Sequence, residues 1–185
     1  LMTANPMSRV RKPQEPPPRD RLPTEEEIDR MAYVAGSDLS TATGRAFHAF
    51  RFACATAMRA GEIVGLSWAD VDLEKRVAHL PETKNGSARN VPMTSEAVEL
   101  LRQLPEREPV FGLSSQQLDA LFRSIKAKAQ VKGLRFHDSR AYALTKLSRK
   151  VDVLTLAKIS GHKDLRILSN TYYRESAEDI AKRLD

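Results

Sequence analysis

One tight turn separates the two parts of this chain in which apolar and polar residues alternate. The turn, residues 83–87, contains Asn85-Gly86, and the alternating runs beside it are residues 71–80 and 88–93. Asn-Gly between such runs is a strong signal for a β-hairpin, because both central residues of its turn need positive φ. Elsewhere apolar residues recur at the three- and four-residue intervals of helices. The sequence therefore predicts a mainly helical domain with one small antiparallel sheet.

Capping signals indicate where several of these helices begin and end. Thr24 precedes three glutamates, and Ser114 precedes Gln117, at the spacing of a capping box. Gly at the end of a helical pattern is typical of a helix C-terminus. The predicted helices are 25–34, one ending near Met58, a short one to Leu66, 94–103, one ended by Gly133, one capped by Asp138, one ended by Gly161, 165–173 and an amphipathic one over 176–184.

The composition predicts a folded protein that can bind a polyanion. The chain has 185 residues, of which 41% are hydrophobic, enough for one compact domain. Lys and Arg number 30 against 24 Asp and Glu, a net charge of +6 that is compatible with nucleic acid but does not by itself require it. The single cysteine, Cys54, excludes an internal disulfide framework, and the four histidines show no metal-ligand spacing. Without a membrane-spanning run or a secretory core, we expect a cytoplasmic protein.

Residues 1–21 differ in composition from the rest of the chain. They are rich in Pro and Arg, and the run 16–18 of three prolines excludes helix and favours extended geometry. A flexible tail and an interdomain linker both fit, and the composition favours a linker that leads to the domain over 22–185. Basic side chains in such a linker can lie along a phosphate backbone. Those residues are Arg9, Arg11, Lys12, Arg19 and Arg21.

The stretch from His137 to Tyr173 concentrates side chains suited to phosphate chemistry. His137 and Arg140 lie one helical turn apart, Gly161 precedes His162, and Tyr172 precedes Tyr173. Each feature has an ordinary alternative. His-x-x-Arg pairs occur on surface helices, a histidine after a helix-ending glycine can interact with the helix dipole, and tyrosines pack in cores.

Two further cations come earlier in the chain. Arg59 follows an apolar helix, where arginine commonly extends to water, and Lys84 stands in the hairpin, where lysine is commonly a solvated turn residue. Cleaving a phosphodiester without a metal requires a nucleophile, a proton acceptor, a proton donor and fixed positive charge. These residues together contain all four.

Taken in order, five segments resemble the catalytic domain of the tyrosine recombinases, the bacteriophage integrase family. They are TAMRAGEIVGLSWADVD, TKNGSARNVPM, HDSRAYAL, LAKISGHKDL and NTYYR, and the resemblance covers about residues 22–185. It implies a tyrosine-recombinase-like fold of the α+β class, helical with a small three-stranded antiparallel sheet. It implies a site-specific recombinase of bacterial or phage origin that cleaves and rejoins double-stranded DNA through a 3′-phosphotyrosine, without a cofactor. Residues 1–21 are similar to the family's linker, which implies a missing N-terminal DNA-binding domain before them. The resemblance also implies a tetramer on paired DNA sites for the full-length protein, whereas we expect this chain alone to be a monomer.

The resemblance assigns roles around the scissile phosphate residue by residue. Arg59 and Arg140 clamp the phosphate, and His162 adds a hydrogen bond to it. Glu62, in the family's acidic position after the first arginine, orients the site without contacting DNA. Lys84 protonates the leaving 5′ oxygen as general acid, and His137 assists as general base for the tyrosine proton.

The position of the nucleophile departs from the family's pattern. The family's tyrosine commonly lies nine residues after the Gly-His histidine, a position held here by Thr171. Aligning the chain with the family backward from the terminal segment SAEDIAKRL selects Tyr172 as the nucleophile, with one residue inserted in the preceding turn. Tyr173 is the alternative nucleophile. Because the tyrosine is shifted, a DNA-binding domain that has lost cleavage is one alternative function. A second alternative is a type IB topoisomerase-like nicking-closing enzyme, since that chemistry uses a similar set of Arg, Lys, His and Tyr residues. The helix over 176–184 can pack on its own domain or on a neighbour's.

Overall fold

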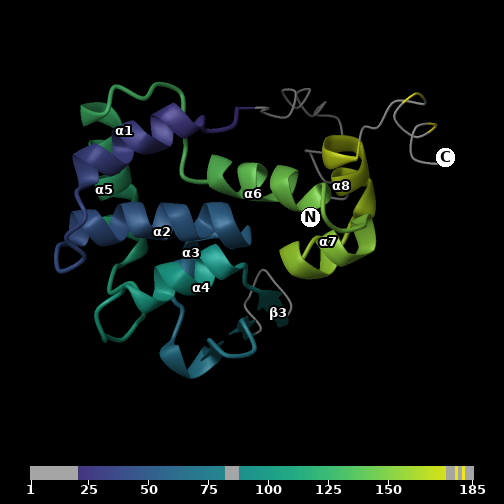
Figure 1. Cartoon of the computed structure of the whole chain (residues 1–185), viewed down its shortest axis with the longest axis horizontal. Coiled ribbons are helices and arrows are strands. Elements are labelled where there is room, and N and C mark those ends of the chain that lie inside the picture. Colours follow the sequence, from purple (N-terminus) through teal and green to yellow (C-terminus); the bar gives the residue numbers. More distant parts are fainter. Residues whose placement is uncertain (1–20, 82–87, 174–177, 179–180, 182–185) are drawn as a thin grey trace, which may run out of the picture.

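The computed structural model describes residues 21–81, 88–173, 178 and 181, and it is mainly helical (Figure 1). Three short strands form one antiparallel sheet in the order β1-β2-β3. The predicted fold class is confirmed. The predicted terminal helix over 176–184 lies, except for two single positions, outside the described residues. The elements are α1 (Glu25–Ala35), α2 (Ala42–Thr56), α3 (Ala60–Val64), a 3-10 turn (Trp68–Asp70), β1 (Val71–Asp72), β2 (Val77–Leu80), β3 (Arg89–Pro92), α4 (Ser95–Arg102), α5 (Ser115–Lys128), α6 (Asp138–Ser148), α7 (Val153–Ser160) and α8 (Leu165–Tyr172).

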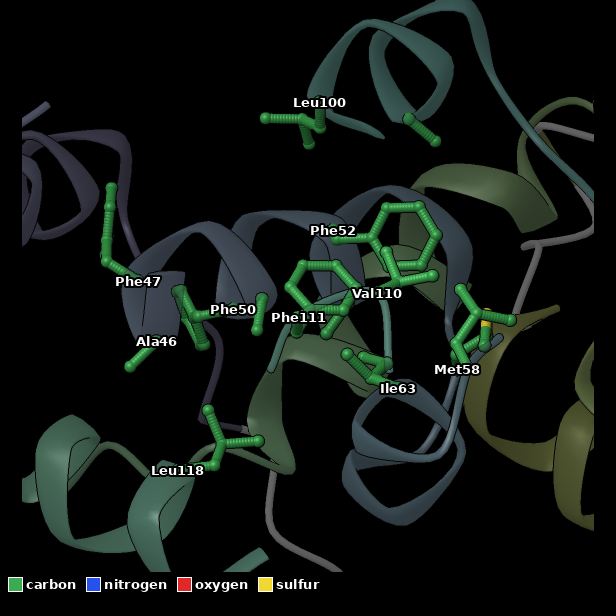
Figure 2. Packing of buried hydrophobic residues seen from close by; sticks show 14 of the residues in the cluster. Ala46, Phe47, Phe50, Phe52, Met58, Ile63, Leu100, Val110, Phe111 and Leu118 are labelled. Atoms are coloured by element: carbon green, nitrogen blue, oxygen red, sulfur yellow. The ribbon is translucent and has the colours of Figure 1, made fainter. Parts of the chain in front are cut away.

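Helix α2 runs through the middle of the molecule, and α1, α4, α5 and α6 pack against it (Figure 1). Phe50 is fully buried; its ring stacks on Phe122 at 4.9 Å between centroids and meets Phe136 edge-on at 5.7 Å. Figure 2 shows Phe52 of the same helix close to Phe111, with 5.4 Å between the ring centroids. Aromatic pairs of this kind add to the free energy gained by burying their area. The core therefore forms around α2.

The sheet forms where alternation was predicted, but residues 71–80 are two strands and not one. The chain reverses between β1 and β2, where Arg76 adopts φ +55° and the Lys75 N–H donates to the Asp72 carboxylate over 2.8 Å. Strand β2 then pairs with β3, with Leu80 opposite Arg89. The residues of this turn, 73–76, include no Gly or Pro, the residues that usually mark a turn in a sequence. The sequence therefore indicated a single strand.

Helices α7 and α8 form a smaller apolar cluster at one end of the molecule (Figure 1). It consists of Ala57, Ala143, Leu144, Leu156, Ala157 and Leu168, and Tyr172 and Tyr173 pack against it. The same region contacts β3 and α6. The end of α8 is thereby held against α6 and α7, and α7 in turn contacts β3.

Three helix boundaries differ from the predictions. Helix α2 ends at Thr56, because Ala57 adopts the left-handed conformation at φ +58°. Helix α5 ends at Lys128 and not at Gly133. Gln130 takes the left-handed position, and the Val131 N–H bonds the Lys126 carbonyl, as in a Schellman motif. Asp138 is the first residue of α6 and not its cap; its carboxylate accepts from the Arg135 N–H over 2.7 Å.

Two kinds of predicted helix terminus agree with the structure. Thr24 and Ser114 form the predicted capping boxes, and Gly161 ends α7 at φ +72°. Within the described part of the chain, none of the helices combines the length and the apolar character needed to cross a lipid bilayer.

Replacing Phe50 with alanine should lower the free energy of unfolding by about 3–5 kcal/mol, because the cavity falls among three packed rings. Urea unfolding at constant pH measures the change. The matched control is Tyr33→Ala, since Tyr33 is 90% exposed on α1 and its replacement should change stability by less than about 0.5 kcal/mol. Equal losses in the two variants would contradict the central position of α2.

Candidate active site

Arg140 lies at the centre of the cluster that the predicted site residues form. Its side chain is 3% exposed, and it donates to the Ser160 carbonyl over 2.6 Å and to the Ala57 carbonyl. It thus ties α6 to the ends of α2 and α7. Burial and the nearby Arg59 lower the pKa of Arg140 to about 10, so the guanidinium stays charged at neutral pH.

Glu62 holds two arginines from opposite sides. Its carboxylate accepts from the backbone N–H of Arg59 over 2.8 Å and from the Arg59 guanidinium over 2.9 Å. It also forms a paired bond with Arg89, over 2.9 and 2.8 Å. Burial opposes ionisation of Glu62, but the hydrogen bonds from Arg89 and Arg59 leave its pKa below the ordinary value. Glu62 is therefore an ionised carboxylate that orients Arg59.

Arg89 belongs to this cluster, although the sequence did not predict it. Its side chain is only 9% exposed, and besides Glu62 it donates from Nε to the Ile159 carbonyl over 3.1 Å. The one signal in the sequence was its place in β3, two residues before the buried Val91 and so on the same, inward face. A charged residue pointing inward needs a charged or polar partner, and Glu62 is that partner.

Both predicted histidines lie within electrostatic reach of these arginines. Partial burial first, and then Arg140 and Arg59, lower the pKa of His162 to about 4. Burial and Arg140 also lower the pKa of His137, although its side chain reaches the surface. His162 Nδ1 lies 2.7 Å from Ser160 Oγ. At neutral pH both rings are therefore uncharged, able to accept or share a proton.

The two tyrosines have different surroundings. Burial raises the pKa of Tyr172 above its ordinary value, and the positive charge of Arg140 offsets only part of that rise, so this phenol lies within electrostatic reach of Arg140. The Tyr173 hydroxyl donates to the Val151 carbonyl over 2.6 Å, and burial and the negative charge of Asp152 both raise its pKa. Thr171 is exposed. Of the two phenols, that of Tyr172 interacts with an arginine charge, and that of Tyr173 is bonded to a carbonyl group.

A hollow of about 370 Å³ lies beside this cluster, between β3 and the end of α7. Arg89 and His162 line it together with Lys158 and Lys163. The arginines 59, 89 and 140 outnumber the nearby carboxylates of Glu62 and Asp138, so the surroundings of the hollow are positively charged. Such a site favours an anion.

The remaining predicted residues do not belong to this cluster in the described part of the chain. Lys84 and four of the linker cations, Arg9, Arg11, Lys12 and Arg19, lie outside the described residues. Arg21 forms an ion pair with Glu27 and donates to the Lys132 carbonyl over 3.4 Å, so it ties the start of the domain to the segment after α5. Among the described residues, no three His, Cys, Asp or Glu side chains gather in a way that could hold a metal ion.

The imidazole of His162 should titrate near pH 4 in the free protein, well below the ordinary 6.5, as measured by NMR of the ring protons. Arg59→Gln should raise this pKa, because it removes one of the positive charges that oppose protonation. The unfolded chain binds this proton below pH 6.5 and the folded chain does not until about pH 4. His162 should therefore make the protein less stable as the pH falls between these values. A titration near 6.5 in both proteins would show that the cluster does not form.

The sequence and the fold of the chain are similar to those of known proteins. The model of the "Phage integrase family" matches residues 22–179. A "Putative integrase/recombinase" of Haemophilus influenzae is 46% identical over 98% of this chain and 62% of its own length. A "Shufflon-specific DNA recombinase" of Escherichia coli is 34% identical over 98% of this chain and 47% of its own length. The chain thus spans about half to two thirds of these relatives.

A solved structure, a lambda integrase dimer bound to a COC′ core site, superposes with a TM-score of 0.73 at 19% identity. It covers 95% of this chain and 55% of the integrase chain. That likeness concerns the fold, and the family match extends over most of the sequence. The chain belongs to the phage integrase family.

Proposed function

We propose that this chain is the catalytic domain of a site-specific DNA recombinase that cleaves and rejoins double-stranded DNA through a 3′-phosphotyrosine. The observation that carries the proposal is the packing of Tyr172 against the cluster at the end of α7, within electrostatic reach of the buried, charged guanidinium of Arg140. A scissile phosphate needs fixed positive charge, and a phenol needs nearby cations to ionise at neutral pH. Membership of the phage integrase family supports the same chemistry.

In the proposed reaction the Tyr172 oxygen attacks the scissile phosphorus, and the bond from phosphorus to the 5′ oxygen breaks. His137 takes the phenolic proton, and Lys84 gives a proton to the leaving 5′ oxygen. The products are a 3′-phosphotyrosine and a free 5′ hydroxyl. Because one phosphoester replaces another, a 5′ hydroxyl from a second strand can reverse the step and complete the exchange.

The phosphate oxygens are bound by the arginines and His162. Arg140 is fixed by two carbonyl groups and Arg59 by Glu62, so both can present N–H groups to an anion without large rearrangement. The proposal assigns the proton of His162 to Nε2, with Nδ1 accepting from the Ser160 hydroxyl 2.7 Å away. The neutral imidazole then has an N–H with which to bind a phosphate oxygen.

Tyr172 is the nucleophile in this proposal. The observation that supports it over Tyr173 is the hydrogen bond from the Tyr173 hydroxyl to the Val151 carbonyl, which occupies the proton an attacking phenol must lose. The alternative of a binding domain without cleavage rested on the shifted register, and the interaction of Tyr172 with the charge of Arg140 argues against it. The name of the E. coli relative, a DNA recombinase, favours strand exchange over a topoisomerase-like activity.

The proposed partner is double-stranded DNA, with a tetramer on paired sites for the full-length enzyme and a monomer for this chain alone. Residues 1–21 remain a proposed linker to an N-terminal DNA-binding domain, and the compartment we propose is the bacterial cytoplasm. The DNA complex of the lambda integrase, whose catalytic domain shares this fold, supports the choice of partner. The helix over 176–184 can complete the site in its own subunit or a neighbour's.

Tyr172→Phe should abolish covalent capture of a nicked DNA substrate whose cleaved fragment diffuses away, because the phenol oxygen forms the covalent bond. Tyr173→Phe should still capture DNA, and Tyr33→Phe, on the exposed face of α1, is the matched control. Denaturing gels of the detergent-resistant adduct measure the outcome. Capture by Tyr172→Phe together with its loss in Tyr173→Phe would assign the nucleophile to Tyr173.

Lys84→Ala should slow cleavage by about 10²–10⁴-fold, the usual contribution of a general acid. A substrate with sulfur in place of the bridging 5′ oxygen should restore most of that rate, because a thiolate leaves without protonation. The control is Lys75→Ala, an exposed lysine between β1 and β2, which should cleave both substrates at the wild-type rate. Equal defects of Lys84→Ala on both substrates would exclude the general-acid role.

A further inference from the structure

We propose that Arg89 is a positioning residue of this site, which fixes Arg59 through Glu62 and fixes the turn that presents His162 through the Ile159 carbonyl. The inference rests on the proposed recombinase function and adds to it a residue that has no contact with DNA. Its basis is the arrangement of three hydrogen bonds from one guanidinium to two separate elements.

The first part of the arrangement concerns Glu62. One carboxylate accepts from Arg89 and from Arg59, and the Arg89 pair uses both carboxylate oxygens. A carboxylate with only the Arg59 side chain and backbone as partners could rotate. The paired bond from Arg89 prevents that, since its two parallel N–H groups fix the plane of the carboxylate. Arg59, which is 40% exposed, thereby acquires a defined direction at the surface.

The second part concerns the end of α7. Nε of Arg89 donates to the Ile159 carbonyl, one residue before the carbonyl that Arg140 holds. Gly161 packs directly on the same side chain: a Cβ at this position would lie 3.2 Å from Cδ and Nε of Arg89. Gly161 also has φ +72°, where other residues are strained. Arg89 therefore defines where the turn leading to His162 can lie.

The third part concerns the sheet. Arg89 pairs with Leu80 at the end of the ladder between β2 and β3, so the sheet fixes where its side chain starts. One side chain thus links β3 to the elements that carry Arg59 and His162. These elements come from distant parts of the sequence. Loss of Arg89 should misplace both residues together.

A direct contact of Arg89 with phosphate is a poorer interpretation. The bonds that fix Arg140 use only Nη1 and Nη2, whereas Nε, Nη1 and Nη2 of Arg89 each donate to a protein acceptor, and the Arg89 side chain is 9% exposed. The more exposed Arg59 and the lysines beside the hollow are better placed for DNA. A positioning role predicts a selective effect on cleavage, whereas a phosphate contact predicts weaker binding.

The test compares Arg89→Lys with wild type and with Arg123→Lys, an exposed arginine of α5, at a temperature where all three are fully folded. Lysine keeps the charge but cannot make the three bonds. Cleavage in the nicked-substrate assay should fall by about 100-fold, as misplacement of reacting groups by about 1 Å can do. The DNA dissociation constant should change by less than about threefold, since the phosphate ligands remain.

The pH profile provides a readout that a purely structural role would not change. Arg89 lowers the pKa of Glu62, so Arg89→Met should raise that pKa and shift the acid limb of the cleavage profile to higher pH. An unchanged limb, or a rate loss that only follows the unfolded fraction, would overturn the positioning role. Weaker DNA binding with an unchanged cleavage rate of the bound complex would identify a phosphate contact instead.

A second experiment is independent of catalysis. The urea midpoints of Arg89→Lys, Glu62→Gln and the double variant should be non-additive, because both single changes break the same bond. Additive midpoints would overturn the proposed link between the two residues. If wild type forms no DNA adduct, the proposed function fails. Non-additive midpoints in that case would retain the link but remove its catalytic meaning, and Arg89 would then be a structural residue.

Discussion

Two adjacent carbonyl groups at the end of α7 are each bound by a buried guanidinium, and the geometry of the site depends on that pair of contacts. Arg89 binds the carbonyl of Ile159, and Arg140 binds that of Ser160. Helix ends leave carbonyl groups without partners and carry a partial negative charge, so cations are favourable there. The two arginines come from β3 and α6. They bring the end of α7, and with it Gly161 and His162, against the sheet and the central helices.

The sequence predicted the features that depend on local geometry. Thr24, Ser114 and Gly161 have the caps expected of them, because capping involves residues only a few positions apart. The wrong prediction for the end of α5 has a local cause as well. Gly133 was expected to end this helix, but the residue that adopts the left-handed conformation after it is Gln130. The link between Arg89 and Glu62 could not be predicted in this way. It joins side chains 27 positions apart, and no periodic pattern relates them.

The pair of tyrosines shows the same limit at the end of the chain. Successive residues of a helix point about 100° apart, so Tyr172 and Tyr173 cannot both face the arginines. Sequence spacing alone leaves the choice open. In the structure it depends on an acceptor from another element, the Val151 carbonyl, which binds the Tyr173 hydroxyl. One extra residue before the tyrosine, relative to the family's usual spacing, is thus compatible with a phenol within electrostatic reach of Arg140.

The charges that suit the site to an anion also work against its stability. The arginines 59, 89 and 140 lie close enough for their positive charges to influence one another and His162. Fixed carbonyl groups and the Glu62 carboxylate compensate part of this repulsion, and keeping the histidines neutral avoids adding to it. A phosphate would compensate the rest. Anion binding and folding are therefore coupled, since a ligand that binds only the folded chain stabilises it. In the proposed function, the residues that make the free domain less stable are the ones that hold the scissile phosphate.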